Sequence, residues 1–353
     1  MIAQPPPTEI MSSNDARLTQ LSLWLTQGLA RQVERIEVAS ADASFRRYFR
    51  VTDRDGSTAI AMDAPPDKEN IAPYLKVARL LETTGVHVPH IYECDPAAGF
   101  VLLEDLGSTP YLARLQAGDD PQRLYGDALA ALAQIQLRGR PVAGQLPSYD
   151  AVLLEREMAL MPEWFCTRHL QLQLQADELG LLRRTFDLLI AEALAQPQVF
   201  VHRDYHSRNL MVLPERNPGV IDFQDAQHGP VTYDLVSLLK DCYISWPRER
   251  VEEWVDSFRR RLLRGGAAEI GNAREFLRSF DLMGVQRHIK VLGIFARLWY
   301  RDGKSGYLAD LPLTLEYVRD ACTRHAELGE FGAWLEQRIV PRLAGANAAA
   351  LRG

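Results

Sequence analysis

Residues 198–226 read QVFVHRDYHSRNLMVLPERNPGVIDFQDA, and this stretch decides the fold. An apolar run leads into a polar loop that contains Asp204, and Asn209 follows five residues later. A second apolar run then meets the turn 214–219, and a third ends in Asp222. Two β-type runs joined by a turn rich in proline, asparagine and glycine predict an antiparallel hairpin. Folding about that turn brings Asn209 and Asp222 to the same open end.

Three oxygen-bearing side chains therefore converge on one edge of the predicted hairpin. Hard oxygen ligands without a nearby thiolate suit Mg²⁺, which takes one or two protein carboxylates together with phosphate oxygens. Asp204 lies on the loop and can accept the proton of a substrate hydroxyl. A base beside an Asn/Asp metal pair is the arrangement of kinase-type phosphoryl transfer. A solvated polar turn explains any one of these residues taken singly, but the spacing of all three favours the kinase interpretation.

The composition restricts the class of protein. The chain has 353 residues, of which 47% are hydrophobic and 24% charged, and its net charge is −6. These values indicate a globular protein with a large core and argue against nucleic acid or an anionic membrane as partner. The four cysteines form no CxxC pair, so neither a disulfide framework nor a zinc site is indicated. We expect a cytoplasmic protein, since no signal peptide and no apolar run of about 20 residues is visible.

Hydrophobic periodicity divides the chain into a β-rich first part and a helical second part. The first part is predicted to contain strands at 35–38, 45–51, 57–62, 88–92 and 100–104, with helices at 14–30, capped by Ser13 or Asn14, and 70–84. In the second part, helices are predicted at 122–137 and 177–195 before the hairpin, and at 234–243, 248–264, 273–300 and 313–328 beyond it.

These elements predict an α+β protein with two lobes. A small antiparallel β-rich N-lobe with one internal helix spans residues 14–106. A large, mainly helical C-lobe spans residues 107–344 and bears the catalytic loop and the hairpin. Residues 1–13 are proline-rich and are predicted to be a disordered tail. Residues 345–353 are alanine-rich and are predicted to be a frayed tail.

The segments VHRDYHSRN and VIDFQDA resemble the aminoglycoside phosphotransferase and choline kinase family, which has the protein-kinase-like fold. The resemblance covers nearly the whole chain after about residue 30. Further segments, namely ASFRRYFRV, AMDAPPDKEN, LLEDLG, DAQHGPVTYDLVSLLKDCY and LWYRDGK, resemble one bacterial branch of that family. That branch contains anomeric kinases of N-acetylmuramate and N-acetylglucosamine that act in peptidoglycan recycling.

The resemblance implies a role for several residues. Asp204 matches the catalytic aspartate, and Asn209 and Asp222 match the Mg²⁺ ligands. The backbone from Glu104 to Leu106 matches the hinge that meets adenine. Two further residues are expected to support the catalytic loop, namely His202 and Asp234. For Asp234 a simple helix N-cap is an equally good interpretation.

His206 separates two kinds of kinase. Protein kinases carry lysine two residues after the catalytic aspartate, whereas small-molecule kinases of this family usually carry histidine. No A-P-E signature follows Asp222. Both observations favour a small-molecule acceptor.

The phosphate-binding half of the site departs from the family pattern. Residues 39–44, which end in Ser44, contain no glycine. The place of the usual strand lysine falls on Met62. Arg46 or Arg47 on the adjacent strand is a candidate to supply the missing charge, although a solvated basic strand face explains each arginine equally well.

Residues for the acceptor are predicted on the loop and the last long helix. The principal candidates are His206, Arg208, Asp225 and Trp299. Further candidates are Gln224, His228, Arg287, His288 and Arg301. A histidine or tryptophan on a helix is more often packed in a core than used as a ligand, so the pattern alone does not choose among them.

The expected activity is transfer of the ATP γ-phosphoryl group, with Mg²⁺, to an amino-sugar hydroxyl by a monomer or weak dimer. The resemblance points to the anomeric hydroxyl of N-acetylmuramate or N-acetylglucosamine. One alternative is a kinase for another small hydroxylated acceptor, such as a choline-like alcohol, homoserine or an aminoglycoside. A second alternative is an inactive nucleotide-binding pseudokinase, which the absent strand lysine and glycines favour and the intact Asp204, Asn209 and Asp222 oppose.

Overall fold

The computed structural model describes residues 15–41 and 45–352. The chain divides into two compact units. One, the sheet unit, comprises Met1–Lys76 and Pro89–Ser108; the other, the helical unit, comprises Val77–Val88 and Thr109–Gly353. The predicted disordered tail 1–13 and Ser44 lie outside the described residues.

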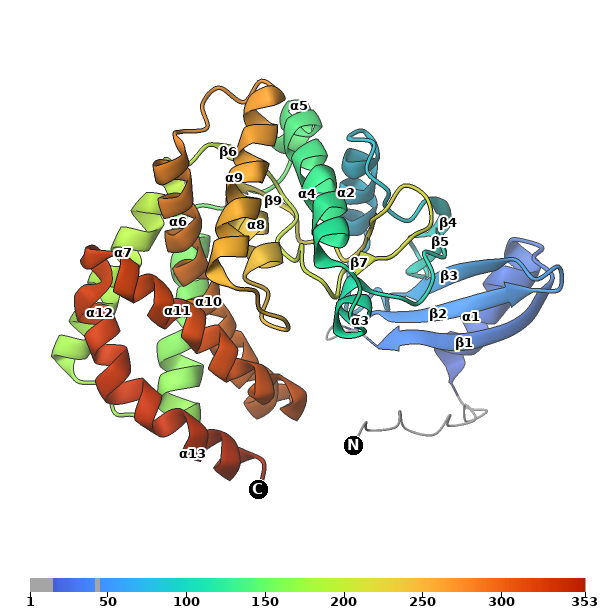
Figure 1. Ribbon diagram of the computed structural model, residues 1–353. Coiled ribbons are helices and arrows are strands. Elements are labelled where there is room, and N and C mark those ends of the chain that lie inside the picture. The colour runs from blue at the N-terminus through green and yellow to red at the C-terminus, as the bar shows by residue number, and fades with distance from the viewer. Residues whose placement is uncertain (1–14, 42–44, 353) are drawn as a thin grey trace. The chain divides into compact units, whose positions relative to one another are not determined.

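The sheet unit is built on a five-stranded antiparallel sheet with the order β1-β2-β3-β5-β4 (Figure 1). Its strands are β1 (Val33–Ala41), β2 (Arg47–Asp53), β3 (Thr58–Asp63), β4 (Ile91–Asp95) and β5 (Phe100–Glu104). Helix α1 (Ala16–Leu23) and a π-helical turn (Trp24–Gly28) precede the sheet, and α2 (Ala72–Glu82) follows β3.

One face of this sheet forms the core of the unit. Phe49 and Val51 point to that face, as the alternation along β2 predicts, and they pack with Leu21 and Leu25 of the first helical segment. The cap of α1 is a correction to the sequence analysis. Asp15, and not Ser13 or Asn14, caps the helix, because its carboxylate accepts hydrogen bonds from the backbone of Arg17 and Leu18.

The helical unit contains two short strand pairs and many helices. Strand β6 (Gln198–Val201) pairs with β9 (Gln227–Pro230), and β7 (Leu210–Met211) pairs with β8 (Gly219–Val220). The helices before the strands are α3 (Tyr111–Gln116), α4 (Pro121–Arg138), α5 (Arg140–Ala143), α6 (Ala151–Met158), the π-helical segment Met161–His169 and α7 (Ala176–Ala195). After the strands follow α8 (Tyr233–Leu239), α9 (Arg248–Arg264), α10 (Ala273–Asp302), the 3₁₀ segments Ser305–Asp310 and Ala326–Leu328, α11 (Leu311–Arg324), α12 (Gly329–Trp334), the π-helical segment Leu335–Ile339 and α13 (Val340–Ala350).

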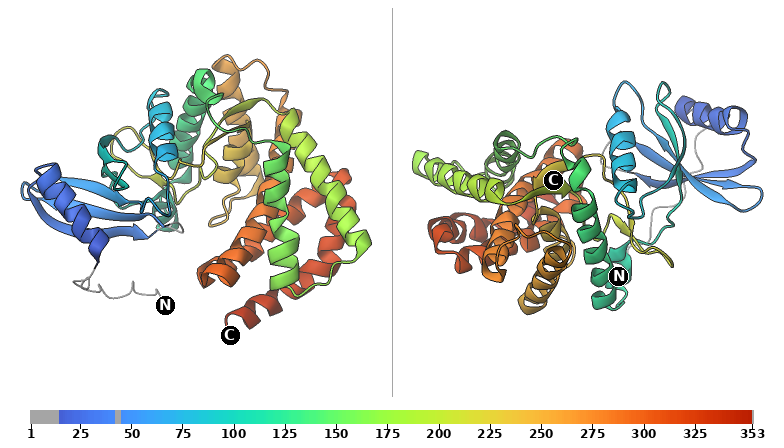
Figure 2. Two further views of the ribbon diagram at one scale, coloured as in Figure 1. Left: turned by 180° about the vertical axis from the view of Figure 1, so that it is seen from behind. Right: turned by 90° about the horizontal axis from the view of Figure 1, so that it is seen from above.

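Helix α10 is the central element of the helical unit, because it packs against α6, α7, α8, α9 and α11. A capping box of Asn272 and Glu275 begins the helix, and Gly303 ends it in the left-handed conformation. Gly293 permits close packing, since a Cβ there would lie 2.4 Å from the backbone carbon of Leu160. Figure 2 shows the bundle from behind and from above, with the red C-terminal helices beside the yellow-green α7.

Three expectations about the helices need correction. Residues 345–350 are not frayed but belong to α13, since Leu343 is buried and Ala346 and Ala350 pack against the core of the unit. The helix predicted at 313–328 ends at Arg324 and is followed by a short 3₁₀ segment. Helices α3, α5, α6, α12 and α13 were not predicted, because short segments carry little periodicity.

No helix within the described ranges is both long and apolar enough to cross a membrane.

Candidate active site

The hairpin of β7 and β8 brings the predicted metal ligands together. Leu210 pairs with Val220 across the hairpin, so the side chains of Asn209 and Asp222 emerge at its open end. The Asn209 Nδ2 donates to Asp222 Oδ2 over 3.1 Å, which confirms the predicted convergence.

The donor set at this end fits Mg²⁺. Asp222 has a φ of +63°, a left-handed conformation that is rare outside glycine and recurs at functional sites. Gln224 donates to Asp222 Oδ1 over 2.9 Å, while its own buried Oε1 has no hydrogen-bond partner among the described residues. No cluster of three or more His, Cys, Asp or Glu side chains that could hold a metal occurs in the described ranges. One carboxylate and one amide suit an ion that draws its other ligands from phosphate and water.

Asp204 is a carboxylate that is surrounded by cations but is not paired. Its side chain accepts no hydrogen bond from any residue that the structure describes, although Asn209 Nδ2 donates to its backbone oxygen over 3.0 Å. Burial raises the pKa of Asp204, but the charges of Lys290, His206, Arg287 and Arg203 lower this pKa by a larger amount. The pKa of Asp204 therefore lies below its ordinary value. The carboxylate is therefore ionised at neutral pH with both oxygens open to a proton.

Two aspartates near α8 fix the backbone of the catalytic loop, residues 202–209. Asp234 accepts hydrogen bonds from the backbone N–H groups of His202 and Arg203 at 2.6 and 2.9 Å, so it is more than a helix cap. Asp241 accepts from the N–H of Ser207 at 3.0 Å and from its hydroxyl. Burial raises the pKa of Asp234 to about 7. The sequence analysis found Asp234 but missed Asp241, which carries no signal beyond its place after an apolar helix.

A buried charge cluster lies beside Asp204. Glu157 on α6 pairs with Arg203 and with Lys290, whose Nζ is 3.1 Å from Glu157 Oε1. Lys290 also donates to the Tyr233 hydroxyl over 2.9 Å. Arg287 donates to the backbone oxygen of Arg203 over 3.4 Å. Arg203 has a φ of +79°, so this cluster holds the residue before Asp204 in a strained conformation.

The sequence analysis proposed Arg287 as an acceptor ligand, but the structure buries it against the catalytic loop. Lys290 and Glu157 were missed. A usable signal was present, since both are charged residues within segments whose pattern predicts burial.

Aromatic side chains border the other side of the loop. The ring of Tyr243 contacts His206 edge-on at 5.5 Å between centroids, and the Arg208 guanidinium lies over the same ring. Burial lowers the pKa of His206, while the charges of Asp241 and Asp204 oppose that change. Asp310 lies near Arg208; burial raises the pKa of this carboxyl to about 6, while Arg208 opposes the rise. Sequence reasoning missed Tyr243 and Asp310.

Three other residues that were predicted to bind the acceptor have different roles in the structure. His288 is buried, with its ring stacked on Tyr317 and its Nε2 2.9 Å from the Lys240 backbone oxygen. Trp299 packs at the edge of the helical core, which explains it without a ligand. Arg301 is exposed and pairs with its neighbour Asp302.

Two predicted residues lie beyond the end of the hairpin. Asp225 is exposed and lies within 3.5 Å of the Gln224 amide, while His228 lies in β9.

The candidate nucleotide residues lie in the sheet unit. Met62 is completely buried and pairs with Tyr48 across the sheet, so its apolar side chain offers no charge to a phosphate. The expectation that Arg47 could supply the missing charge is wrong. Asp15 and Asp63 engage its guanidinium, which leaves it no uncompensated charge for phosphates. Arg46 forms interactions within the protein.

The residues of the predicted hinge lie at the end of β5. Glu104 accepts from the His90 N–H over 3.2 Å, and Leu106 is buried. Next to them, Arg50 of β2 pairs with Asp105 over 2.7 Å.

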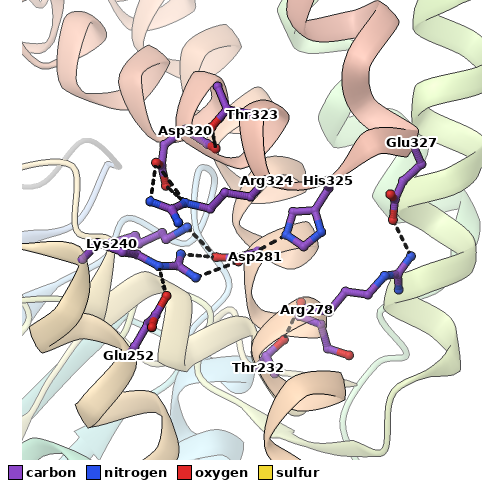
Figure 3. A network of polar contacts seen from close by, with 12 residues as sticks. Thr232, Lys240, Glu252, Arg278, Asp281, Asp320, Thr323, Arg324, His325 and Glu327 are labelled. Atoms are coloured by element: carbon purple, nitrogen blue, oxygen red, sulfur yellow. Dashed lines mark hydrogen bonds and ion pairs between the residues drawn. The ribbon is translucent and has the colours of Figure 1, made fainter.

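A second charged network is centred on Asp281 and lies among the helices (Figure 3). Asp281 on α10 accepts from Lys240 at 2.9 Å, from Arg248 at 2.6 and 2.9 Å and from His325 at 3.2 Å. Lys240 directly precedes Asp241, so this network also anchors the carboxylate that holds Ser207.

Known proteins with similar sequences share one description. The model of the phosphotransferase enzyme family (APH) matches residues 35–276. A protein of Pseudomonas aeruginosa called N-acetylmuramate/N-acetylglucosamine kinase is 47% identical over 333 residues, which cover 92% of this chain and 97% of that protein. A protein of the same name from Neisseria meningitidis is 43% identical over 326 residues, covering 92% and 96%.

Solved structures with a similar fold have much lower identity. A Plasmodium vivax ethanolamine kinase has a TM-score of 0.61 and 13% identity, covering 89% of this chain and 91% of its own. A choline kinase from Streptococcus pneumoniae has a TM-score of 0.61 and 12% identity, covering 86% and 100%. An ADP-bound aminoglycoside phosphotransferase has a TM-score of 0.57 and 13% identity, covering 86% and 97%. These likenesses and the family match agree with the site: the chain has the kinase-like fold and belongs to the phosphotransferase enzyme family.

Proposed function

We propose that the protein is an ATP-dependent sugar kinase that phosphorylates N-acetylglucosamine and N-acetylmuramate. The observation that carries the proposal is the state of Asp204, which is ionised, unpaired and held in place by its own loop. The names of the relatives at 43–47% identity supply the acceptors. We place the acceptor in the helical unit beside Asp204, and we further propose a role in cell-wall recycling.

Each residue of the proposed site has one role in the reaction. Asp204 accepts the proton of the attacking hydroxyl as the new O–P bond forms and the bond to the β-phosphate oxygen breaks. A positioned base of this kind contributes about 10²–10⁴-fold to the rate. Asn209 and Asp222 would hold Mg²⁺, which supplies charge neutralisation at the phosphates when it is bound. His206, which packs against Tyr243 in the same loop, would border the acceptor.

We propose the anomeric hydroxyl as the group that is phosphorylated. It is the most acidic hydroxyl of a reducing sugar, because the ring oxygen withdraws electron density from the same carbon. An ionised but weakly basic carboxylate such as Asp204 suits such a hydroxyl better than an ordinary alcohol. Choline-like or homoserine acceptors offer only ordinary alcohols.

One observation keeps a non-catalytic nucleotide-binding protein as the second candidate. Met62, at the expected place of a phosphate-binding lysine, is apolar and buried, and Arg47 is neutralised by carboxylates. A protein of this kind would bind nucleotide but transfer nothing.

An acceptor panel tests the proposal. ATP consumption with Mg²⁺ is measured with N-acetylglucosamine, N-acetylmuramate, choline, homoserine and an aminoglycoside. We expect turnover with the two amino sugars, and stimulation by choline or an aminoglycoside alone would contradict the assignment. Nucleotide binding without turnover on any acceptor would select the second candidate.

The metal pair is tested by Asp222→Ala. We expect the affinity for Mg-ATP to fall at least tenfold in a calorimetric titration, because Asp222 is the one carboxylate of the donor set. Affinity for ATP measured without Mg²⁺ is the control and should change much less. An unchanged affinity for Mg-ATP would remove Asp222 as a metal ligand.

A further inference from the structure

Arg208 is a charged residue of the catalytic loop that takes no part in bracing that loop. It lies four residues after Asp204 and directly before Asn209. Its side chain is exposed, and it forms no hydrogen bond or ion pair with any residue of the described part of the chain. The guanidinium carbon lies 3.4 Å from the centre of the Tyr243 ring. A guanidinium that lies flat on an aromatic face keeps its N–H edge open, and that edge matches a planar carboxylate.

The position of Tyr243 is fixed relative to the reacting centre. Asp241 accepts from the N–H of Tyr243 at 3.0 Å and from the N–H of Ser207 at 3.0 Å, so a single buried carboxylate joins the ring to the catalytic loop. The ring also packs against His206 and Phe295. Arg208 is thus held by both its backbone and the face of its side chain, which lowers the entropy cost of using it for recognition.

The carboxyl group of Asp310 lies near the positive charge of Arg208. Asp310 is half-buried near Arg208 at the start of α11, and no ion pair joins the two. Arg208 therefore has a counter-charge in its vicinity when the acceptor is neutral, yet its hydrogen-bonding edge stays unused. Such an arrangement tolerates a neutral acceptor and favours an anionic one.

We propose that Arg208, held on Tyr243, is a carboxylate-binding subsite that recognises an acidic arm of the acceptor sugar. The inference rests on the proposed function and adds a specificity-determining residue to it. N-acetylmuramate is N-acetylglucosamine with a lactyl ether that ends in a carboxylate. The two proposed acceptors therefore differ by the one group that this subsite binds.

The test compares Arg208→Met with the wild type on both sugars. We expect kcat/KM for N-acetylmuramate to fall on the order of 10- to 100-fold relative to that for N-acetylglucosamine, mainly through KM, because a charge-assisted hydrogen bond is lost. Arg208→Lys should lose less, since it keeps the charge but not the planar fork. Asp310→Asn should shift the preference the other way, toward the carboxylate-bearing sugar. Arg250→Met is the matched control, because it removes an exposed arginine that rests on tryptophan rings of another segment.

The possible failures are distinct. An equal loss on both sugars would assign Arg208 to the transferred phosphate and overturn the subsite. No loss on either sugar would also overturn it. If the wild type phosphorylates neither sugar, the proposed function fails first and the subsite falls with it. A thermal midpoint like that of the wild type shows that the variant is folded.

Discussion

Asp204 and Asp281 are two carboxylates of the same helical unit in opposite situations. Asp281 is buried and accepts hydrogen bonds from Lys240, Arg248 and His325. Asp204 is surrounded by cations, yet its carboxylate accepts no hydrogen bond from the described residues. A carboxylate with all of its acceptor sites used holds helices together, whereas one that is charged but unpaired is available for chemistry.

Helix α10 carries Asp281 and also two of the cations that act on Asp204. Asp281 lies on its third turn and binds side chains from α9 and from the ends of α8 and α11. Arg287 and Lys290 lie two to three turns later and act on Asp204 through space, while they bond to Tyr233 and to the backbone of Arg203. One helix therefore contributes both to the stability of the unit and to the charge around Asp204.

The largest effect is expected for Asp204→Asn. The amide cannot accept the proton, so kcat should fall about 10²–10⁴-fold. The thermal midpoint should fall less than in Asp281→Ala, since no hydrogen bond to the carboxylate is lost. Glu215→Gln, an exposed change in the turn of the same hairpin, is the control. Turnover near the wild-type level in Asp204→Asn would rule out this base.

The reverse pattern is expected for Asp281→Ala. Removing this carboxylate leaves Lys240 buried without its ion-pair partner and Arg248 with Glu252 alone, which should cost about 3–5 kcal/mol of unfolding free energy in a urea titration. Asp320→Ala breaks an exposed pair with Arg324 and should cost less than about 1 kcal/mol. A loss in Asp281→Ala no larger than in this control would show that the network is not structural.

Asp281 also predicts a pH dependence of stability. Burial raises the pKa of Asp281, but His325, Lys240 and Arg248 lower it far below the ordinary value of about 3.9. A depressed folded-state pKa gives stability that is present above the unfolded-state value and is lost as the pH falls below it. The wild type should therefore lose unfolding free energy below about pH 4, and Asp281→Asn should lack that part of the loss.

A smaller effect is expected for Lys290→Met. The positive charge of Lys290 lowers the pKa of Asp204, so its removal should raise that pKa. Because only ionised Asp204 accepts a proton, the acidic limb of the pH profile of kcat should move to higher pH. Lys290→Arg keeps the charge and should leave the limb near its wild-type position. A limb that does not move in Lys290→Met would show that this cation does not act on the base.

Local sequence predicted the part of the site that the hairpin forms. The turn 214–219 alone brings Asn209 and Asp222 together, so no distant contact was needed. Asp241, Lys290 and Glu157 were not predicted, because their partners lie 34 to 133 residues away in the sequence. A charged residue in an apolar helix signals burial with a partner but does not name that partner.

The fold was predictable for a similar reason. Four of the five strands directly follow or precede a tight turn, whereas β9 pairs with β6 across residues 202–226 and was missed. The alanine-rich end of the chain was predicted to be frayed, but burial of Leu343 holds it in α13. For the sheet unit, the sequence did not decide which cationic side chain would contact the phosphates. The structure removes Arg47 from the candidates, because Asp15 and Asp63 engage its guanidinium.

Phosphorus NMR of the reaction product tests the central claim most directly. The protein is incubated with Mg-ATP and N-acetylglucosamine, and a parallel sample contains Asp204→Asn at the same concentration. We predict a sugar phosphate whose phosphorus is coupled to the anomeric proton in the wild-type sample, and no such product on the same timescale in the variant. ADP with inorganic phosphate and no sugar phosphate, or equal product in both samples, would contradict the account.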